Sequence, residues 1–112
     1  MSRYRINPGE FRHIITFQEL EEEVNSFGEM TKEWIDKFST RAGIYPLSGK
    51  EFFSVDKLNT EISHKINIRY RADIKPSMRI KFNDRYFYIE SIINFQEKNI
   101  LIQIMAKELI DG

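Results

Sequence analysis

The stretch from Thr60 to Arg71 reads Thr-Glu-Ile-Ser-His-Lys-Ile-Asn-Ile-Arg-Tyr-Arg, and its apolar and polar side chains alternate almost without interruption. Side chains of a β-strand point alternately to opposite faces, so this pattern predicts a long strand with one buried and one solvated face. The expected buried face carries Ile62, His64, Ile66, Ile68 and Tyr70. The opposite face carries Ser63, Lys65, Asn67, Arg69 and Arg71, whose cations should meet an acidic neighbour or an anionic partner.

Further strands are expected on both sides of this one. A first strand is predicted over 11–19, with Phe11, Ile15 and Phe17 pointing inward. Segment 30–45 is ambiguous, because Trp34, Ile35 and Phe38 fit one helical turn as well as a strand, while its β-branched residues lean towards a strand. Later strands are predicted over 78–82, 86–93 and 100–105, with turns at 83–84 and 94–99 and a tail over 107–112.

The expected fold is therefore mainly β, a small antiparallel β-barrel or sandwich of about six strands with one short inserted helix. The helix is predicted over 49–58, since Ser48 is a plausible N-cap and Glu51 stands three residues later, as a capping box requires. With 112 residues the chain is expected to be a single domain over 1–112. Residues 1–8 are expected to be a flexible N-terminal arm, and 47–59 an inserted helix or loop.

Composition excludes several classes of protein. Lys plus Arg and Asp plus Glu both number 17, and the zero net charge argues against a dedicated nucleic-acid binder. The chain has no cysteine, which excludes disulfides, thiolate nucleophiles and Cys-based zinc sites and fits a reducing cytoplasm. No apolar run is long enough for a signal peptide or a membrane span.

The sequence predicts no catalytic residue, no metal ligand set and no cofactor. His13 and His64 meet only if their strands pair, and a histidine on an apolar strand face is more often a satisfied core residue than a ligand. Ser48-Gly49-Lys50 lacks the glycine spacing of a phosphate loop. An alternative function is single-stranded nucleic-acid binding by an OB-like barrel, in which bases stack on Tyr4, Tyr70, Tyr86 and Tyr88 beside Arg69 and Arg85.

Three stretches of the chain are notable for their wording as well as their periodicity. The first is Asn7-Pro8-Gly9-Glu10-Phe11-Arg12-His13 with Ile15-Thr16-Phe17-Gln18. The second is Ala42-Gly43-Ile44-Tyr45-Pro46-Leu47-Ser48-Gly49-Lys50-Glu51. The third is His64-Lys65-Ile66-Asn67-Ile68-Arg69-Tyr70-Arg71 with Met78-Arg79-Ile80-Lys81-Phe82, continuing through 86–92. This ordered set resembles the tailed-phage head–tail joining family, the head-completion or stopper proteins of phages and prophages.

This resemblance implies a structural virion protein at the head–tail interface, assembled in the host bacterial cytoplasm. It implies a small β-barrel-like domain that forms a ring under the portal and adaptor proteins, closes the channel around the packaged DNA and docks a tail-completion or tail-tube protein. The segment that matches the channel-closing loop of the family is 47–59. Its candidate gating residues are Ser48, Lys50, Glu51, Asp56 and Lys57, which face DNA or one another, or are merely solvated.

A subunit interface is also expected. The acidic run Glu19–Glu23 is either a solvated hairpin tip or a protrusion that meets a basic face on a neighbouring copy. Rings are built from contacts between two different surfaces of one chain, and this neutral chain has an acidic and a basic one. The candidate interface residues are Glu21, Glu22, Glu23, Lys65, Arg69 and Arg71.

Overall fold

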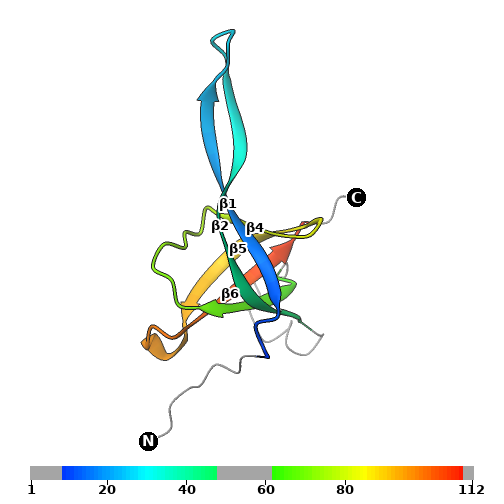
Figure 1. Cartoon of the computed structure of the whole chain (residues 1–112), viewed down its shortest axis with the longest axis vertical. Coiled ribbons are helices and arrows are strands. Elements are labelled where there is room, and N and C mark those ends of the chain that lie inside the picture. The colour runs from blue at the N-terminus through cyan, green and yellow to red at the C-terminus, as the bar shows by residue number, and fades with distance from the viewer. Residues whose placement is uncertain (1–8, 48–61, 110–112) are drawn as a thin grey trace, which may run out of the picture.

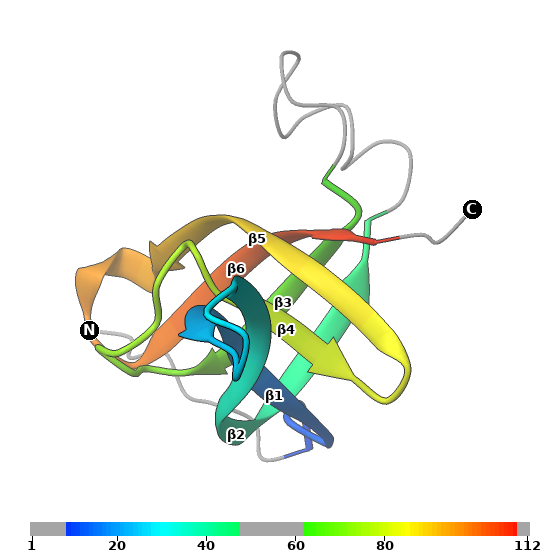
Figure 2. The same ribbon diagram turned by 90° about the horizontal axis from the view of Figure 1, so that it is seen from above.

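Six antiparallel strands close into a barrel from which one long hairpin projects (Figure 1). The computed structural model describes residues 9–47 and 62–109. The strands are β1 (His13–Val24), β2 (Met30–Pro46), β3 (His64–Arg69), β4 (Arg79–Phe82), β5 (Arg85–Asn94) and β6 (Leu101–Glu108), with the 3-10 turn η1 (Phe95–Glu97). Their order around the barrel is β1-β2-β3-β6-β5-β4, and Figure 2 looks down on this ring of strands. The predicted fold class is confirmed, as a barrel rather than a sandwich.

The projecting hairpin consists of the outer halves of β1 and β2. β1 pairs with β4 only over Thr16–Gln18, and β2 pairs with β3 only from Ala42 onward, so both strands extend beyond the wall. We call residues 19–36 the arm. A register shift between Phe17 and Gln18 marks the place where β1 leaves the barrel. The arm makes the molecule 60 Å long but only 28 × 24 Å across (Figure 1).

Strand β2 resolves the ambiguity of segment 30–45 in favour of a strand. It runs in register with β1 from Val24↔Met30 to His13↔Ala42, and cross-strand pairing over that length outweighs the single helical turn that the sequence permits. It ends at Pro46, which has no N–H to continue the ladder.

The barrel interior is filled by alternate side chains of all six strands. Phe17 and Phe87 are the largest fully buried residues, and Phe38 stacks on Phe17 with ring centroids 4.9 Å apart. Aliphatic residues fill the remainder, chiefly Ile15, Ile66, Ile68, Ile80, Ile102 and Ile104. The predicted inward positions of the first strand, Phe11, Ile15 and Phe17, are all buried.

Two expectations about the stretch 60–71 are wrong. The strand β3 ends at Arg69, so Tyr70 and Arg71 lie beyond it, and Tyr70 is 37 % exposed rather than part of the core. Asn67 was expected on the solvated face but is buried, because Glu10 lies over it and accepts a hydrogen bond from its amide. The inward positions Ile62, His64, Ile66 and Ile68 are buried as expected.

The expected tail is also partly wrong, and one prediction lies outside the described part of the chain. Lys107 and Glu108 belong to β6, since Glu108 pairs with Phe87 of β5. The helix predicted over 49–58 falls within residues 48–61, which the structure does not describe.

Candidate interaction surfaces

The base of the arm is held to the barrel by a stack around Arg79. The Arg79 guanidinium lies 4.3 Å from the Trp34 ring on the arm and 4.1 Å from the Tyr86 ring on β5. Its Nε donates a 2.7 Å hydrogen bond to Gln18 Oε1, and Gln18 Nε2 donates one of 2.7 Å to Asp36 Oδ1. Planar guanidinium groups stack on aromatic faces in this way, so side chains of four strands, β1, β2, β4 and β5, fix the direction of the arm.

The acidic run lies along β1 in the arm rather than at its tip, and much of it is paired within the same chain. Lys37 Nζ is 2.6 Å from Glu21 Oε2, Lys32 Nζ is 3.8 Å from Glu22 Oε1, and Lys75 Nζ is 3.2 Å from Glu19 Oε1. The hydrogen bond from Lys37 to Glu21 raises the pKa of that lysine. Among the candidate interface acids, Glu23 has no ion pair within the described residues.

The arm ends in a hydrogen-bonded turn over 25–29. The side-chain Oδ1 of Asn25 accepts hydrogen bonds from the backbone N–H groups of Phe27 and Glu29, both at 2.9 Å. Gly28 has φ = 80°, a left-handed conformation that glycine adopts without steric cost. The turn is therefore a defined structure, although Ser26, Phe27 and Glu29 are exposed.

The basic face of β3 carries Lys65 and Arg69, four positions apart on the same side of the strand. Lys65 Nζ lies 5.5 Å from the centroid of the Tyr45 ring, and the Arg69 guanidinium lies 5.9 Å from that of Phe11. Within the described ranges neither cation has a carboxylate partner in a salt bridge.

The third predicted cation, Arg71, is engaged elsewhere. It donates two hydrogen bonds of 2.9 Å to the Asp73 carboxylate and lies 3.8 Å from the Phe38 ring centroid. These hydrogen bonds lower the pKa of Asp73. The structure therefore keeps Lys65 and Arg69 together on the basic face and separates Arg71 from them.

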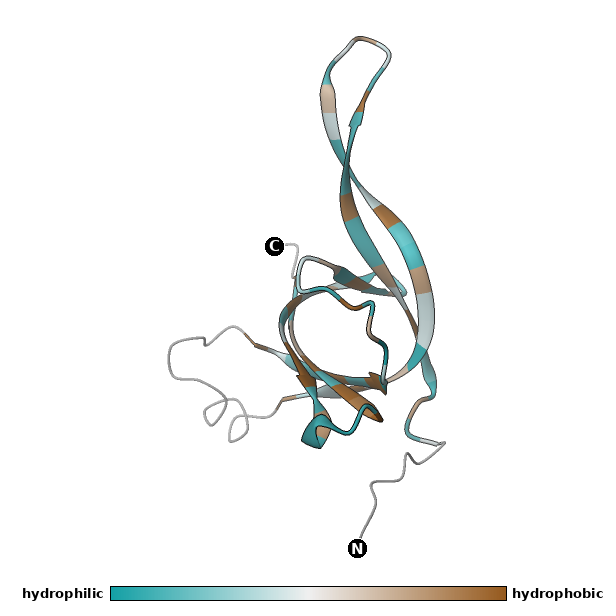
Figure 3. Ribbon diagram, turned by 90° about the vertical axis from the view of Figure 1, so that its left-hand side faces the viewer, coloured by the Kyte–Doolittle hydropathy of each residue, from teal (hydrophilic) through white to brown (hydrophobic). Residues whose placement is uncertain are grey.

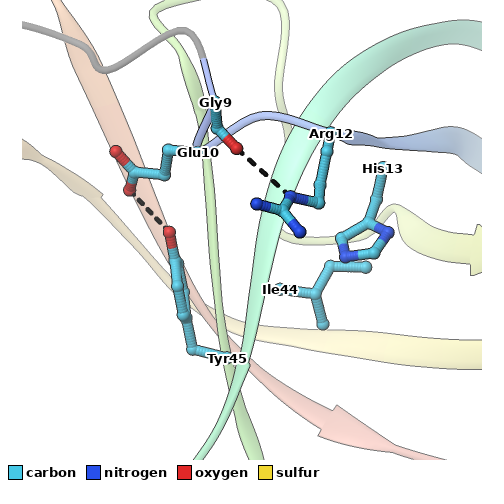
Figure 4. Close-up of a pocket in the computed structure, with 6 residues that line it drawn as sticks. All are labelled: Gly9, Glu10, Arg12, His13, Ile44 and Tyr45. Atoms are coloured by element: carbon cyan, nitrogen blue, oxygen red, sulfur yellow. Dashed lines mark hydrogen bonds between the residues drawn. The ribbon is translucent and has the colours of Figure 1, made fainter.

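An open pocket of about 250 Å³ lies where the segment before β1 crosses β2 (Figure 4). It is lined by Gly9, Glu10, Arg12, His13, Ile44 and Tyr45. The Tyr45 hydroxyl donates a 2.8 Å hydrogen bond to Glu10 Oε1, and Arg12 Nε donates one of 3.3 Å to the Gly9 carbonyl. Gly43 permits this crossing, because a Cβ there would lie 2.7 Å from the Tyr45 hydroxyl and 3.1 Å from the Glu10 carbonyl oxygen. The polar groups that line the pocket bind one another, and its lining is more polar than that of a typical small-molecule site.

His64 forms a buried polar cluster near the ends of β3, β5 and β6. Arg85 Nη2 donates to its Nε2 at 3.3 Å, so Nδ1 carries the proton and donates to Ser63 Oγ at 2.8 Å. Burial lowers the pKa of His64, Glu108 opposes this effect, and Arg85 adds to it. Arg85 also donates two hydrogen bonds to Glu108, which lower the pKa of that carboxyl. This is the satisfied core histidine expected from the sequence.

The geometry does not support the other chemical sites considered. His13 is on β1 and His64 on β3, and these strands do not pair. In ranges 9–47 and 62–109 no cluster of three His, Cys, Asp or Glu residues suits a metal ion, and no helix is long and apolar enough to cross a membrane. Tyr86 stacks on Arg79, and Tyr88 lies 6.4 Å from Trp34, so these two of the four rings proposed to bind bases already have partners. The gating candidates Ser48, Lys50, Glu51, Asp56 and Lys57 lie outside the described residues.

Comparison with known proteins decides the family. The model of the phage head completion protein family matches residues 6–109. The chain belongs to this phage head completion protein family. Head completion protein gp16 of Bacillus phage SPP1 is 33 % identical over 100 residues, which cover 88 % of this chain and 92 % of gp16. The resemblance inferred from the sequence is confirmed.

Two solved structures share the fold of this head completion protein. The solution structure of protein SF1141 from Shigella flexneri 2a has a TM-score of 0.76 and 27 % identity, covering 96 % of this chain and all of the other. A chain of the virion of a native gene transfer agent particle has a TM-score of 0.64 and 17 % identity, covering 97 % and 100 %. At that identity the second match shows the fold alone. As a head completion protein, the chain is a structural component of the phage head that associates with other virion proteins.

No sequence signal singled out the Arg79 stack. Arg79 falls in the strand predicted over 78–82, and nothing in its spacing from Trp34 or Tyr86 reveals the contact. The two rings come from other strands, one of them in the ambiguous segment 30–45.

Proposed function

We propose that copies of this chain form a ring at the head–tail junction, under the portal and adaptor proteins. There they retain the packaged DNA and offer a surface to a tail-completion or tail-tube protein. The observation that carries the proposal is family membership across residues 6–109, combined with a closed barrel whose arm and basic face are different surfaces. A ring needs such a pair of unlike surfaces. We expect no catalytic activity from this structural component.

The proposed ring contact places the acidic side of one arm against the basic face of the next copy. Support comes from Lys65 and Arg69, which lack carboxylate partners in the described structure, and from Glu23 in the outer part of the arm, which lacks a cation. Glu21 and Glu22 contribute less, since Lys37 and Lys32 already neutralise them. Arg71 is the weakest candidate because Asp73 holds it.

The channel-closing role is proposed for residues 47–59, with Ser48, Lys50, Glu51, Asp56 and Lys57 facing DNA non-specifically. It rests on the family resemblance and on the contact between the described residues on either side of the segment. Leu47 N donates to the Ser63 carbonyl at 2.9 Å, and Pro46 pairs with His64.

The test is add-back of purified protein to DNA-filled heads made without it, followed by electron microscopy and a nuclease assay for released DNA. Wild-type protein is expected to bind the vertex, prevent leakage and permit tail attachment. Failure of wild-type protein to change leakage or tail attachment would refute the proposed function. A mobility shift with short single-stranded DNA separates the alternative, because a base-stacking barrel binds tightly and loses affinity with salt.

The ring contact has its own test. The double variant Lys65→Glu/Arg69→Glu is expected to lose ring density at the vertex while keeping its unfolding midpoint, and Glu23→Lys in the same chain should restore part of it. Lys98→Glu, an exposed charge change in the turn before β6, is the matched control. Normal rings from the folded double variant would remove this contact from the proposal.

A further inference from the structure

We propose that the tip of the arm, formed by Val24, Phe27 and Met30, is a docking knob. It enters an apolar cleft, rimmed by Lys or Arg side chains, on another protein of the phage head. This inference rests on the proposed function only in that the partner is a neighbour at the same vertex. Glu23, beside the knob, is shared with the proposed ring contact, but the apolar side chains that form the knob take no part in that contact.

The exposure of these side chains is the first observation. Phe27 is 85 % exposed, Val24 64 % and Met30 63 %, and Val24 and Met30 are cross-strand partners. Farther down the same face of the ribbon, beyond the charged pair Glu22 and Lys32, lie the paired residues Leu20 and Trp34. Figure 3 shows apolar bands between polar ones along the arm. Scattered exposed apolar residues are ordinary, but a contiguous group marks an interaction site.

The second observation is that the knob is held in place. Phe27 and Glu29 donate their backbone N–H groups to Asn25, and Gly28 supplies the left-handed residue, so the turn that carries the exposed Phe27 has a defined backbone. At the other end of the arm, Arg79 clamps Trp34 against Tyr86. A preorganised element loses little conformational entropy on binding, so a fixed turn and a fixed arm favour docking by the knob.

Charge identifies the partner. Glu23 and Glu29 are exposed beside the knob and have no ion pair among the described residues, whereas Glu22 pairs with Lys32 at 3.8 Å. Complementary potentials across an interface therefore require a basic rim around an apolar cleft. A symmetric contact between two tips would bring these glutamates face to face. The pocket beside Tyr45 is also unsuitable, because the Glu10 carboxylate lines it.

The experiment compares the tip with an equally apolar position elsewhere. Purified Phe27→Ser and Met30→Ser variants are titrated against DNA-filled heads that lack this protein, beside wild type and the control Ile93→Ser, whose isoleucine is 43 % exposed on β5. Because Phe27 makes few contacts in the free chain, its replacement should leave the unfolding midpoint unchanged. We expect Phe27→Ser to weaken binding roughly 10- to 100-fold, as expected for losing a fully buried phenylalanine at an interface. Ile93→Ser should bind like wild type.

Two results would overturn the knob and leave the proposed function standing. One is that Phe27→Ser binds as tightly as wild type to heads that the wild-type protein completes normally. The other is self-association of the free chain in sedimentation velocity that Phe27→Ser abolishes, which would make a second copy the occupant. Charge is tested by Glu29→Lys, which should weaken binding at low salt more than at high salt. Equal loss at both salt concentrations contradicts the basic rim.

Discussion

Replacing Arg79 with alanine is expected to release the arm from the barrel. The substitution removes two stacking contacts, with Trp34 at 4.3 Å and Tyr86 at 4.1 Å, and a charged hydrogen bond to the buried Gln18. Each stack contributes about 0.5–1 kcal/mol where partly exposed. The hydrogen bond contributes about 1.5 kcal/mol or more. The expected loss in free energy of unfolding is therefore about 3 kcal/mol.

Two measurements check this expectation. With a denaturant slope of about 1.5 kcal/mol per molar urea, the unfolding midpoint should fall by about 2 M. The chain has a single tryptophan, Trp34, so its fluorescence reports the arm base directly, and acrylamide should quench it more strongly in the variant. Arg79→Lys keeps the charge but loses the planar stack, so its urea midpoint and its quenching should lie between those of wild type and Arg79→Ala. An unchanged midpoint with unchanged quenching in Arg79→Ala would refute the role assigned to the stack.

Two further predictions concern the barrel. Burial lowers the pKa of His64 in the folded state below the ordinary value near 6.5. Neutral His64 therefore contributes its full share to the free energy of unfolding above pH 6.5, and this contribution is lost as the pH falls through the folded-state pKa. Urea midpoints should therefore decline on acidification from pH 7, with a second loss below about 4.5 from Glu108, and His64→Gln should flatten the first decline. An equal first decline in that variant contradicts this assignment. Gly43→Ala should destabilise the protein by about 1–3 kcal/mol by displacing Tyr45 and Glu10. Calorimetry checks this, and an unchanged melting temperature would show that the crossing adjusts freely.

The sequence predicted those parts of the fold in which local periodicity and burial agree. Alternation placed Ile66 and Ile68 in the core and Phe17 in the first strand, because the side-chain period of a strand is independent of its partners. It failed at Asn67 and Tyr70, whose surroundings are set by a distant segment and by the end of pairing. Periodicity contains no information about either.

The candidate surfaces were predicted only in part. The sequence left the run of glutamates as either a solvated hairpin tip or a protrusion. The run lies along the projecting arm, and the cross-strand register that pairs Glu21 with Lys37 and Glu22 with Lys32 is not visible in composition. Phe27 stands in a polar stretch, Asn25–Glu29, where a single aromatic residue gives no periodic signal. Its significance emerges only when the turn that presents it is known.

The hydrogen bond between Leu47 and Ser63 has a consequence for how such chains vary. Strands β2 and β3 are paired up to this point, and Leu47 is hydrogen-bonded to Ser63, so a segment inserted between these two residues is anchored at two adjacent points. Doubling the length of such an insertion costs only about 0.6 kcal/mol in closure entropy. We therefore expect the barrel to tolerate longer or shorter inserts at this position without a change in the register of its six strands.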